Sequence, residues 1–539
     1  MTGAAPLAVE DLTFRYRDRE TPAIRHISFT ARAGEVLLIA GASGCGKTTL
    51  IRAINGLIPR SYKGEVTGGV LVHGESTAGW KLSTISQRIG TVLQDPERQI
   101  LGTKVLNEVA FGLENLGLDR PEILRRAESA LATLRISELR DRDTFSLSGG
   151  EKQKVALAGV LAMRPSILLL DEPLASLDPA SALESLDLVR RLADEGMTVL
   201  LVEHRVEDVL RIRPETVMFL SQGAVRYFGD PQGLFKAVDY REVKLPARDI
   251  VALAAADPAP APLHILPGVL ASVTSPLPLV KFENVSFGYE SDQDVLQSIS
   301  LEIRRGDVIA VLGANGAGKT TLVKHAIGLL KPKSGRVLVA GRDTKETSVA
   351  QIAGTLGYVF QSPSHMLFAP TVREELAFGP SNLKHPRDEI EKEVQEALRI
   401  VNLTEREKDP PLALSFGQQK RVSIAAILSM RSQILVMDEP TAGQDYQNYM
   451  NFMDSILQLP GLGAILFITH DVDLAVIYAN RVLLVSGGRL VADGSPEVVL
   501  SDFKQLEACR LVPSSLLALN VERLPATRRF MRAEALAHI

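Results

Sequence analysis

The sequence predicts an α/β protein in which one domain occurs twice in tandem. Short aliphatic runs such as EVLLIA and SILLLD in the first half, and DVIAVL and QILVMD in the second, lead into glycine-rich loops or end in an acidic residue. Continuous apolar runs of this kind are typical of parallel strands buried on both faces. Helical patterns follow the glycine loops, so the order strand, loop, helix predicts ligand binding at the carboxyl ends of the strands.

The duplication appears as five pairs of similar segments that follow one another in the same order and at nearly constant spacing. GASGCGKT matches GANGAGKT, VLQDP matches VFQSP, and LSGGEKQKVALA matches LSFGQQKRVSIA. ILLLDEPLASLD matches ILVMDEPTAGQD, and VEHRVEDV matches ITHDVDLA. A long repeat of this kind indicates one fold present twice. We therefore expect domain 1 at residues 1–244, an Ala/Pro-rich linker at 245–278, domain 2 at 279–505 and a C-terminal tail at 506–539.

Composition narrows the functional classes. The net charge of −4 argues against a chain that binds nucleic acid through overall charge. Only two cysteines occur, which suits a reducing compartment and argues against a disulfide scaffold or a zinc finger. No secretory signal is visible at the N-terminus. The apolar tract from Leu263 to Val280 is interrupted by three prolines, so we do not expect it to span a membrane.

The segment between the halves is rich in alanine and proline (AAADPAPAP). Such a composition cannot build a core of its own and predicts a tether whose ends lie about 30 Å apart. The two halves are therefore expected to meet as an intramolecular pair at high effective concentration.

The glycine loops predict phosphate binding in both halves. Two glycines five residues apart let the backbone N–H groups face one anion at a helix N-terminus. Lys47 and Lys319 are expected to reach the β- and γ-phosphates, and Thr48 and Thr320 to offer hydroxyls to Mg²⁺. A glycine-rich turn could match once by chance, but two equivalent matches argue against that. The predicted nucleotide-binding residues of the loops are Gly41, Ala42, Ser43, Gly44, Cys45, Gly46, Lys47, Thr48, Thr49, Gly313, Ala314, Asn315, Gly316, Ala317, Gly318, Lys319, Thr320 and Thr321.

An acidic pair ends an apolar run downstream of each lysine, at a similar distance in the two halves. Asp171 and Asp438 are predicted to hold Mg²⁺ beside the phosphate loop. The adjacent Glu172 and Glu439 are the natural groups to polarise an attacking water. Solvated loop acids are the alternative, but the position at the end of a buried strand favours the catalytic interpretation.

The segments LSGGE (Leu147–Glu151) and LSFGQ (Leu414–Gln418) lie shortly before the acidic strands. With them the chain resembles the ATP-binding-cassette (ABC) superfamily over nearly its whole length outside the linker and tail. The resemblance implies two P-loop NTPase domains that bind ATP and Mg²⁺, each with a RecA-like core, an antiparallel β subdomain and a helical signature subdomain. It also implies a pseudo-dimer in which the signature of each domain touches the γ-phosphate held by the other. The signature residues expected at the nucleotide are Ser148, Gly149, Gly150, Ser415, Gly417 and Gln418.

Four more residues match glutamine and histidine positions of that family. Gln94 and Gln361 match the Q-loop, which implies that they sense Mg²⁺ and water, contribute to the metal site and face a membrane partner. His204 and His470 end apolar strands and match the switch histidine that contacts the γ-phosphate. A single histidine at a strand end is usually structural, so the paired recurrence favours the functional role.

Two further pairs match the family more loosely. Asp178 and Asp445 match the loop after the catalytic acid that communicates across the dimer. Tyr16 and Tyr289 resemble the aromatic residue that stacks on adenine, although ordinary strand aromatics remain the alternative.

The second signature departs from the pattern because Phe416 replaces its first glycine. The added side chain could slow the site at Lys47, or it could be tolerated because Ser415 and Gly417 remain. Both sites keep the lysine, aspartate, glutamate and histidine, which favours two competent sites.

QDPERQI followed by NEVAFGLENLGL resembles the ATPase subunits of energy-coupling-factor transporters. The second half matches less well, with Ser362 and Met366 in place of the usual residues. The resemblance implies two membrane partners, a transmembrane coupling subunit and a substrate-capture subunit, and a location at the cytoplasmic face of the membrane. It also implies uptake of a vitamin or a transition-metal ion.

A soluble tandem cassette that acts on ribosomes or nucleic acid is the main alternative, and an exporter subunit is another. The nearly uncharged linker argues against the first, and no nucleic-acid partner is expected. The basic segment RLPATRRFMR near the C-terminus is predicted to be a solvated surface or a lipid-proximal patch.

Overall fold

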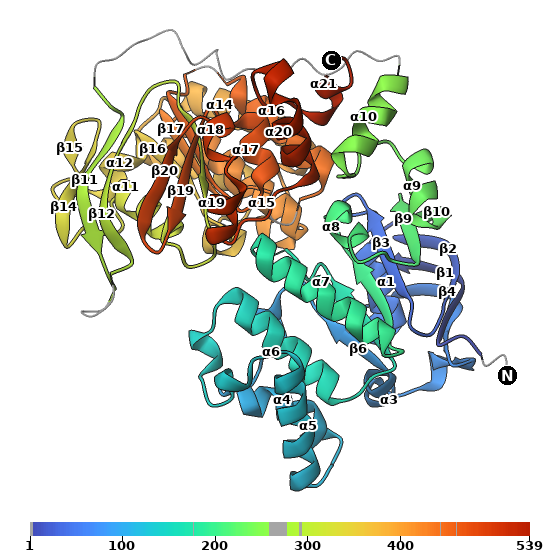
Figure 1. Cartoon of the computed structure of the whole chain (residues 1–539). Coiled ribbons are helices and arrows are strands. Elements are labelled where there is room, and N and C mark those ends of the chain that lie inside the picture. Colours follow the sequence, from blue (N-terminus) through green and yellow to red (C-terminus); the bar gives the residue numbers. More distant parts are fainter. Residues whose placement is uncertain (1–3, 176, 258–276, 290–293, 442–443, 460) are drawn as a thin grey trace. The chain divides into compact units, whose positions relative to one another are not determined.

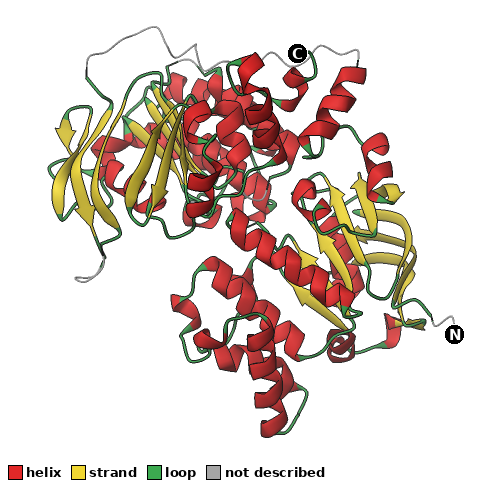
Figure 2. Ribbon diagram, viewed as in Figure 1, coloured by secondary structure: helices red, strands yellow, loops and turns green. Residues whose placement is uncertain are grey.

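The computed structural model describes residues 4–175, 177–257, 277–289, 294–441, 444–459 and 461–539. The chain divides into two compact units, the first comprising Met1–Leu245 with Asp445–Gln447 and the second comprising Pro246–Gln444 with Asn448–Ile539. Figure 1 labels the elements of both units, and Figure 2 separates their helices from their strands by colour. The predicted α/β class is confirmed, since each unit has one largely parallel sheet and one antiparallel sheet.

The main sheet of unit 1 has six strands in the order β10-β9-β3-β8-β7-β6. All neighbours in it are parallel except β9 and β10. The residues of β3, β7 and β8 are buried along their whole length, as the aliphatic runs predict. Its strands are β3 (Val36–Gly41), β6 (Ile89–Val92), β7 (Ile167–Asp171), β8 (Thr198–Val202), β9 (Thr216–Ser221) and β10 (Ala224–Gly229).

The second sheet of unit 1 is antiparallel, with four strands in the order β2-β1-β4-β5. Residues of β2 alternate between exposed and buried over much of its length, as expected of a strand with one face on a core. That face shares a core with β3 and the helix after the glycine loop, since Leu7, Phe14, Ile39 and Leu50 belong to one buried cluster. Its strands are β1 (Leu7–Tyr16), β2 (Ile24–Ala31), β4 (Gly64–Val72) and β5 (Glu75–Ser76).

Three helices of unit 1 pack against one another as a group of their own, and most of the others lie against the sheets. In Figure 1, α4, α5 and α6 lie beside one another, and the first signature is at the start of α6. The helices are α1 (Lys47–Ile54), α2 (Leu57–Arg60), α3 (Leu82–Arg88), α4 (Val105–Asn115), α5 (Arg120–Thr133), α6 (Gly149–Ala162), α7 (Pro179–Asp194), α8 (Val206–Leu210) and α9 (Pro231–Ala237).

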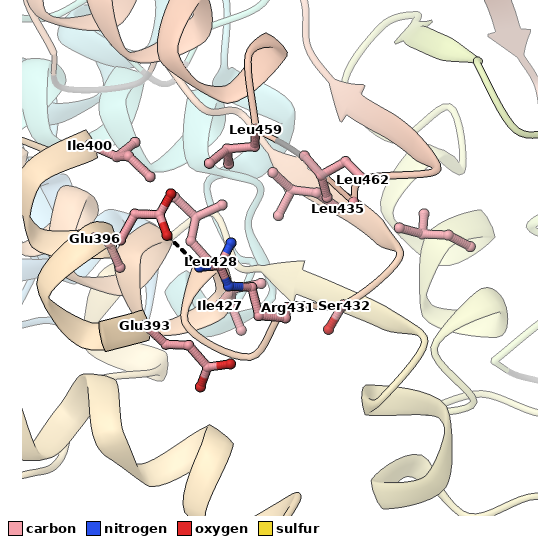
Figure 3. A pocket seen from close by; sticks show the side chains of 13 residues that line it. Glu393, Glu396, Ile400, Ile427, Leu428, Arg431, Ser432, Leu435, Leu459 and Leu462 are labelled. Carbon is pink, nitrogen blue, oxygen red and sulfur yellow. Dashed lines mark hydrogen bonds and ion pairs between the residues drawn. The ribbon is translucent and has the colours of Figure 1, made fainter. Parts of the chain in front are cut away.

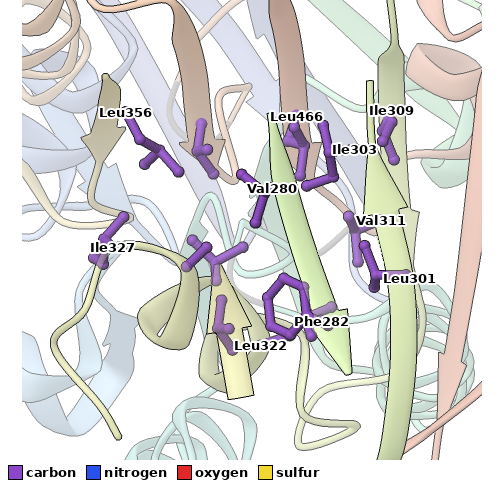
Figure 4. Packing of buried hydrophobic residues seen from close by; sticks show 14 of the residues in the cluster. Val280, Phe282, Leu301, Ile303, Ile309, Val311, Leu322, Ile327, Leu356 and Leu466 are labelled. Carbon is purple, nitrogen blue, oxygen red and sulfur yellow. The ribbon is translucent and has the colours of Figure 1, made fainter. Parts of the chain in front are cut away.

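Unit 2 repeats this architecture. Its six-stranded sheet has the order β16-β17-β18-β13-β19-β20, and its antiparallel sheet the order β12-β11-β14-β15. Figure 4 shows side chains of both sheets and of α11 meeting in one core, among them Phe282, Val311 and Leu322. The strands are β11 (Val280–Phe287), β12 (Leu296–Ile303), β13 (Val308–Leu312), β14 (Ser334–Val339), β15 (Arg342–Asp343), β16 (Leu356–Val359), β17 (Ile434–Asp438), β18 (Ala464–Ile468), β19 (Arg481–Ser486) and β20 (Arg489–Gly494).

The helices of unit 2 include one, α10, that precedes its first strand. They are α10 (Ala247–Ala256), α11 (Lys319–Ala326), α12 (Val349–Ala353), α13 (Val372–Asn382), α14 (Arg387–Ile400), α15 (Phe416–Leu428), α16 (Tyr446–Leu457), α17 (Val472–Tyr478), α18 (Pro496–Val499), α19 (Phe503–Ala508), α20 (Ser515–Thr527) and α21 (Ala533–Leu536).

Helix α10 covers residues that the sequence assigned to the linker. The backbone N–H of Ala247 donates to Ser515 Oγ at 2.7 Å, and Arg248 pairs with Glu522 at 2.7 Å, so α10 lies against the helices of the tail. Ile250 and Ala254, four residues apart, are buried. Most of the remaining linker, with the greater part of the apolar tract 263–280, lies outside the described residues. Among the helices that the structure describes, none is long and apolar enough to cross a membrane.

The tail is folded, and its basic segment is not simply a solvated surface. Arg532 is 5% exposed, and its guanidinium donates to Asp454 Oδ2 at 3.1 Å and to the hydroxyl of Tyr478 at 3.0 Å. The same guanidinium carbon lies 5.2 Å from the centre of the Tyr478 ring. For Arg532 the predicted solvated or lipid-proximal position is wrong, because helices α16 and α17 supply a partly buried carboxylate and an aromatic ring for it.

Candidate functional site

The glycine loops lie between β3 and α1 in unit 1 and between β13 and α11 in unit 2. Lys47 Nζ donates to the carbonyl oxygens of Gly41 and Ala42 at 2.8 and 3.0 Å. Lys319 Nζ makes the equivalent bonds to Gly313 and Ala314 at 2.7 and 2.8 Å. Each loop thus curls around its own buried ammonium, which brings a positive charge to the N-terminus of the following helix.

Two glycines of the first loop are required by its backbone. Gly46 has φ of 110°, and a Cβ there would lie 2.7 Å from the carbonyl oxygen of Ala23. Gly41 has φ of 146°, and its Cβ would lie 2.3 Å from the carbonyl oxygen of Leu220. Any other residue would clash with backbone that cannot move aside, so the predicted loop geometry needs glycine at both positions.

The two strand-ending aspartates lie in buried, polar surroundings. Asp171 is 5% exposed, and among the described residues its Oδ1 has no hydrogen-bond partner. Burial, reinforced by neighbouring Glu172, raises the pKa of Asp171 to about 6. In unit 2, Thr320 Oγ1 and the Tyr358 hydroxyl both donate to Asp438 Oδ2 at 2.9 Å, and burial also raises the pKa of Asp438.

These carboxylates fit a divalent cation. A buried carboxylate oxygen without a donor is costly, and a hard cation held by aspartate and hydroxyl oxygens removes that cost. Thr320 already lies against Asp438, as a shared magnesium site requires. Mg²⁺, when bound, supplies charge that neutralises phosphate oxygens.

Glu172 and Glu439 follow directly in an unusual backbone conformation. Their φ values are 51° and 47°, and their N–H groups donate to Val202 and Ile468 at 2.9 Å in both units. A non-glycine residue in this region stores strain, which is common at functional sites. The same strained turn at equivalent positions of the two units fixes where each carboxylate points.

A histidine holds each of these glutamates. His204 Nε2 lies 2.9 Å from Glu172 Oε1, and His470 Nδ1 lies 2.9 Å from Glu439 Oε1. Burial alone would raise the pKa of both glutamates, but the adjacent imidazole and the charge of the phosphate-loop lysine together outweigh it, and the pKa values are lowered. Both carboxylates are therefore kept ionised and able to accept a proton.

The second oxygen of each glutamate has a different partner in the two units. In unit 1, Gln94 Nε2 donates to Glu172 Oε2 at 2.6 Å, so the predicted Q-loop residue reaches the predicted base. In unit 2, Thr469 Oγ1 lies 3.3 Å from Glu439 Oε2 and takes that place. The side chain of Gln361 is exposed in this structure.

Both signatures begin a helix with a capping box. Ser148 Oγ accepts from the N–H of Glu151 at 3.3 Å, and Glu151 Oε2 accepts from the N–H of Ser148 at 2.7 Å. Ser415 and Gln418 make the same reciprocal pair at the start of α15. The structure thus gives each signature serine a capping role. The side chain of Phe416, on which the alternative of a slower site depends, lies outside the described part of the chain.

The remaining predicted residues lie near these motifs. The Tyr16 hydroxyl is 3.2 Å from Thr49 Oγ1, and the Tyr289 hydroxyl is 3.3 Å from Thr321 Oγ1, so each tyrosine borders the helix that follows a glycine loop. Asp178 caps α7, and Asp445 directly precedes α16.

The sequence analysis missed Glu203, which precedes the switch histidine of unit 1. It is 2% exposed and accepts from the N–H of Leu174 at 2.8 Å and of His204 at 3.0 Å. Burial, with the charge of Glu172 next, raises the pKa of Glu203 to about 7. Comparing VEH (202–204) with ITH (468–470) in the repeat could have identified Glu203, because unit 2 has an uncharged residue, Thr469, at the equivalent position.

A cavity of about 100 Å³ in unit 2 lies elsewhere (Figure 3). Its lining includes Ile434 at the start of β17, Leu462 just before β18 and an ion pair between Glu396 and Arg431. These are the amino ends of the parallel strands, whereas Lys319 and Asp438 lie at the carboxyl ends. Ligands of open α/β sheets bind at the carboxyl ends, so the cavity is separate from the candidate site.

Comparisons with known proteins agree with this geometry. The family model for ABC transporters matches residues 24–175 and 296–442. An ABC transporter ATP-binding protein of Methanosarcina mazei is 35% identical over 94% of this chain and 91% of its own length. Another, from Enterococcus faecalis, is 36% identical over 95% of this chain and 94% of its own.

Among solved structures, cbiO1 from Clostridium perfringens, described as part of the ABC transporter complex cbiONQ, is 33% identical. It matches with a TM-score of 0.40 and covers 49% of this chain and 99% of that chain. The two family matches, one in each half, and the relatives that match nearly end to end show that the chain belongs to the ABC transporter family, as one of its ATP-binding proteins.

Proposed function

We propose that this chain is the ATP-hydrolysing motor of an energy-coupling-factor type importer. It would work at the cytoplasmic face of a membrane with a coupling subunit and a substrate-capture subunit, driving uptake of a vitamin or a transition-metal ion. The observation that carries the hydrolytic part is the glutamate–histidine pair at 2.9 Å beside the buried strand-ending aspartate, present in both units.

The residues have separate roles in this proposal. Lys47 and Lys319 bind the phosphates, and Asp171 and Asp438 hold Mg²⁺. Glu172 and its counterpart orient the attacking water and accept its proton, and their lowered pKa values keep both carboxylates ionised before that step. Each histidine fixes its glutamate and, by resemblance to the family, contacts the γ-phosphate. Two composite sites, each completed by the signature of the other half, form part of the proposal.

The importer assignment is supported by the turn after Gln94. Asp95 Oδ1 accepts from the N–H of Glu97 at 3.0 Å, and Gln99 Oε1 accepts from the N–H of Leu93 at 2.9 Å. The acid-Pro-x-x-Gln element thus folds back on the strand that carries the Q-loop. In unit 2, Met366 Sδ receives the equivalent bond from the N–H of Phe360 at 3.3 Å, so methionine keeps the turn with a weaker acceptor.

Exposed apolar side chains beside both Q-loops support a protein partner. In unit 1, Leu101 and Phe111 are 70% and 44% exposed. At the same repeat positions in unit 2, Phe368 and Phe378 are 61% and 52% exposed, and their rings stack edge to face at 4.7 Å. Apolar side chains that gather at an exposed surface often mark a binding site.

Hydrolysis is tested by two matched variants of the full chain, Glu172→Gln and Glu439→Gln. We expect each to lower ATP turnover and the double variant to lose about 100-fold or more, since a positioned base contributes about 10²–10⁴. Equal losses from the single variants would support the two competent sites that the sequence favours. A much larger loss from Glu439→Gln would instead support the alternative, in which Phe416 slows the site at Lys47. Full turnover in the double variant would contradict the proposal.

The partner is tested by purifying the tagged chain from a detergent-solubilised membrane fraction of its own cells. Co-purification of two membrane proteins and a bound small molecule or metal would support the importer. Co-purification of ribosomes or nucleic acid would instead support the alternative function, a soluble tandem cassette that acts on ribosomes or nucleic acid.

A further inference from the structure

Helix α15 of unit 2 carries a lysine whose charge is completely enclosed. Lys420 is 0% exposed, and Nζ donates to three backbone carbonyl oxygens. The distances are 2.8 Å to Phe360, 2.8 Å to Gln361 and 3.0 Å to Asp438. An ammonium group has three protons to donate, so these three bonds use it fully.

The three carbonyls belong to two motifs of the candidate site. Phe360 and Gln361 follow β16 and begin the Q-loop, and Asp438 ends β17 immediately before Glu439. The lysine itself follows the signature Ser415 by little more than one helical turn. One side chain therefore joins the signature helix, the Q-loop and the strand that presents the metal and base carboxylates, all within unit 2.

Unit 1 is built differently at the same position. When the two signature segments are aligned, the counterpart of Lys420 is Gln153, and the amide of Gln153 donates to the carbonyl oxygen of Pro173. The Q-loop of unit 1 is instead held through the side chain of Gln94, which bonds Glu172. The two nucleotide sites thus fix their Q-loops by different means, a charged tether to the backbone in unit 2 and a side-chain bond to the base in unit 1.

We propose that Lys420 is a positioning residue for the nucleotide site of unit 2, holding the Q-loop and the Asp438–Glu439 turn in fixed register with the signature helix. The inference rests on the proposed ATP hydrolysis and adds that the two sites differ in how the Q-loop is held. Lys420 bonds only the backbone oxygens of Gln361 and Asp438, and not the side chains through which these residues are expected to act. Its loss should therefore change turnover rather than ATP binding.

The kinetic test uses Lys420→Gln, which gives unit 2 the residue of unit 1, in a full chain that also carries Glu172→Gln. Turnover then reports the site of unit 2. We expect kcat to fall at least tenfold while KM for ATP stays within about twofold. If Glu172→Gln alone abolishes turnover, the sites are obligatorily coupled, and the same tenfold loss is expected for Lys420→Gln in the otherwise unaltered chain. An unchanged kcat, or a rise in KM that accounts for the loss, would overturn the proposal.

Amide hydrogen exchange on the nucleotide-free chain tests the tether without any activity. Lys420→Gln should speed exchange in peptides covering residues 356–368 at least fivefold and leave residues 89–101 of unit 1 unchanged. The converse variant, Gln153→Lys, should slow exchange in residues 89–101, and it keeps the proposal testable if Lys420→Gln does not fold. Unaltered exchange of the Q-loop in both variants would overturn the role of Lys420. A native chain without any ATP turnover would instead contradict the proposed function and leave this test of the tether intact.

Discussion

Replacing Glu203 with glutamine should change how the stability of unit 1 depends on pH. The carboxyl is 2% exposed, and its pKa is raised from 4.5 to about 7, chiefly by burial. Below pH 4.5 the group is protonated in both the folded and the unfolded chain and has no pH-dependent effect. As pH rises past 4.5 the unfolded chain ionises first, so the native protein loses stability up to about pH 7.

The magnitude follows from the two pKa values. Their difference corresponds to about 3 kcal/mol at most, most of which develops between pH 5 and pH 8. Glutamine cannot ionise, so the Glu203→Gln variant does not lose this stability as the pH rises. The variant also weakens the bond from the N–H of His204, which costs about 1 kcal/mol at every pH. The free energy of unfolding of the variant minus that of the native chain should therefore rise by roughly 2–3 kcal/mol from pH 5 to pH 8.

The assay uses the only tryptophan of the chain, Trp80, which packs against the core of unit 1. Urea unfolding followed by its fluorescence reports unit 1, and the change in the midpoint at each pH gives the difference in free energy. Glu20→Gln, which removes a carboxylate at an exposed position in the same unit, is the matched control. The reasoning would be refuted if the free energies of unfolding of Glu203→Gln and the native chain changed in parallel with pH. It would also be refuted if the free energy of the variant minus that of the native chain fell toward pH 8.

Two further predictions concern unit 2. The imidazole of His325 is 0% exposed, with Nδ1 at 2.8 Å from the Thr321 carbonyl, and burial lowers its pKa, so unit 2 should lose stability as pH falls below about 6.5, where the unfolded histidine takes up a proton. Calorimetry should show that His325→Ala, which introduces the residue of unit 1 at this position, reduces the difference in stability of unit 2 between pH 5 and pH 7.5, and an unaltered difference would contradict this role of His325. Arg532→Met should destabilise unit 2 by about 2 kcal/mol because Asp454, whose side chain is 25% exposed, would lose its buried partner. If the calorimetric unfolding transition of unit 2 is unchanged in this variant, the tail contributes no stability through this pair.

Much of the candidate site could be predicted from the sequence because its motifs are local. Lys47, Asp171 and His204 each follow or end a buried strand, and the carboxyl ends of parallel strands meet at one edge of the sheet. The strand pattern alone was therefore enough to predict that these residues lie close together. The pairing of His204 with Glu172 at 2.9 Å follows the same logic, since β7 and β8 are neighbours.

Other features could not be predicted, because the relevant partner lies far along the chain. Nothing near Lys420 distinguishes a buried lysine from an exposed one at a polar helix start, and its three acceptors come from two other segments. The alanine and proline content of the linker hid the helical spacing of Ile250 and Ala254, which are buried only because the tail helices lie beside them.

The sequence by itself determined the duplication, the α/β class and which residues we propose for the phosphate, metal and base roles, since short-range spacing and strand order specify them. Only the tertiary structure decided which side chains hold those residues in place. Gln94 supports the base in unit 1 and Thr469 in unit 2, and a buried ammonium fixes the Q-loop only in unit 2 among the residues described. The physical reason is that the pKa and position of a buried polar group depend on every segment packed around it, and a linear pattern does not specify that packing.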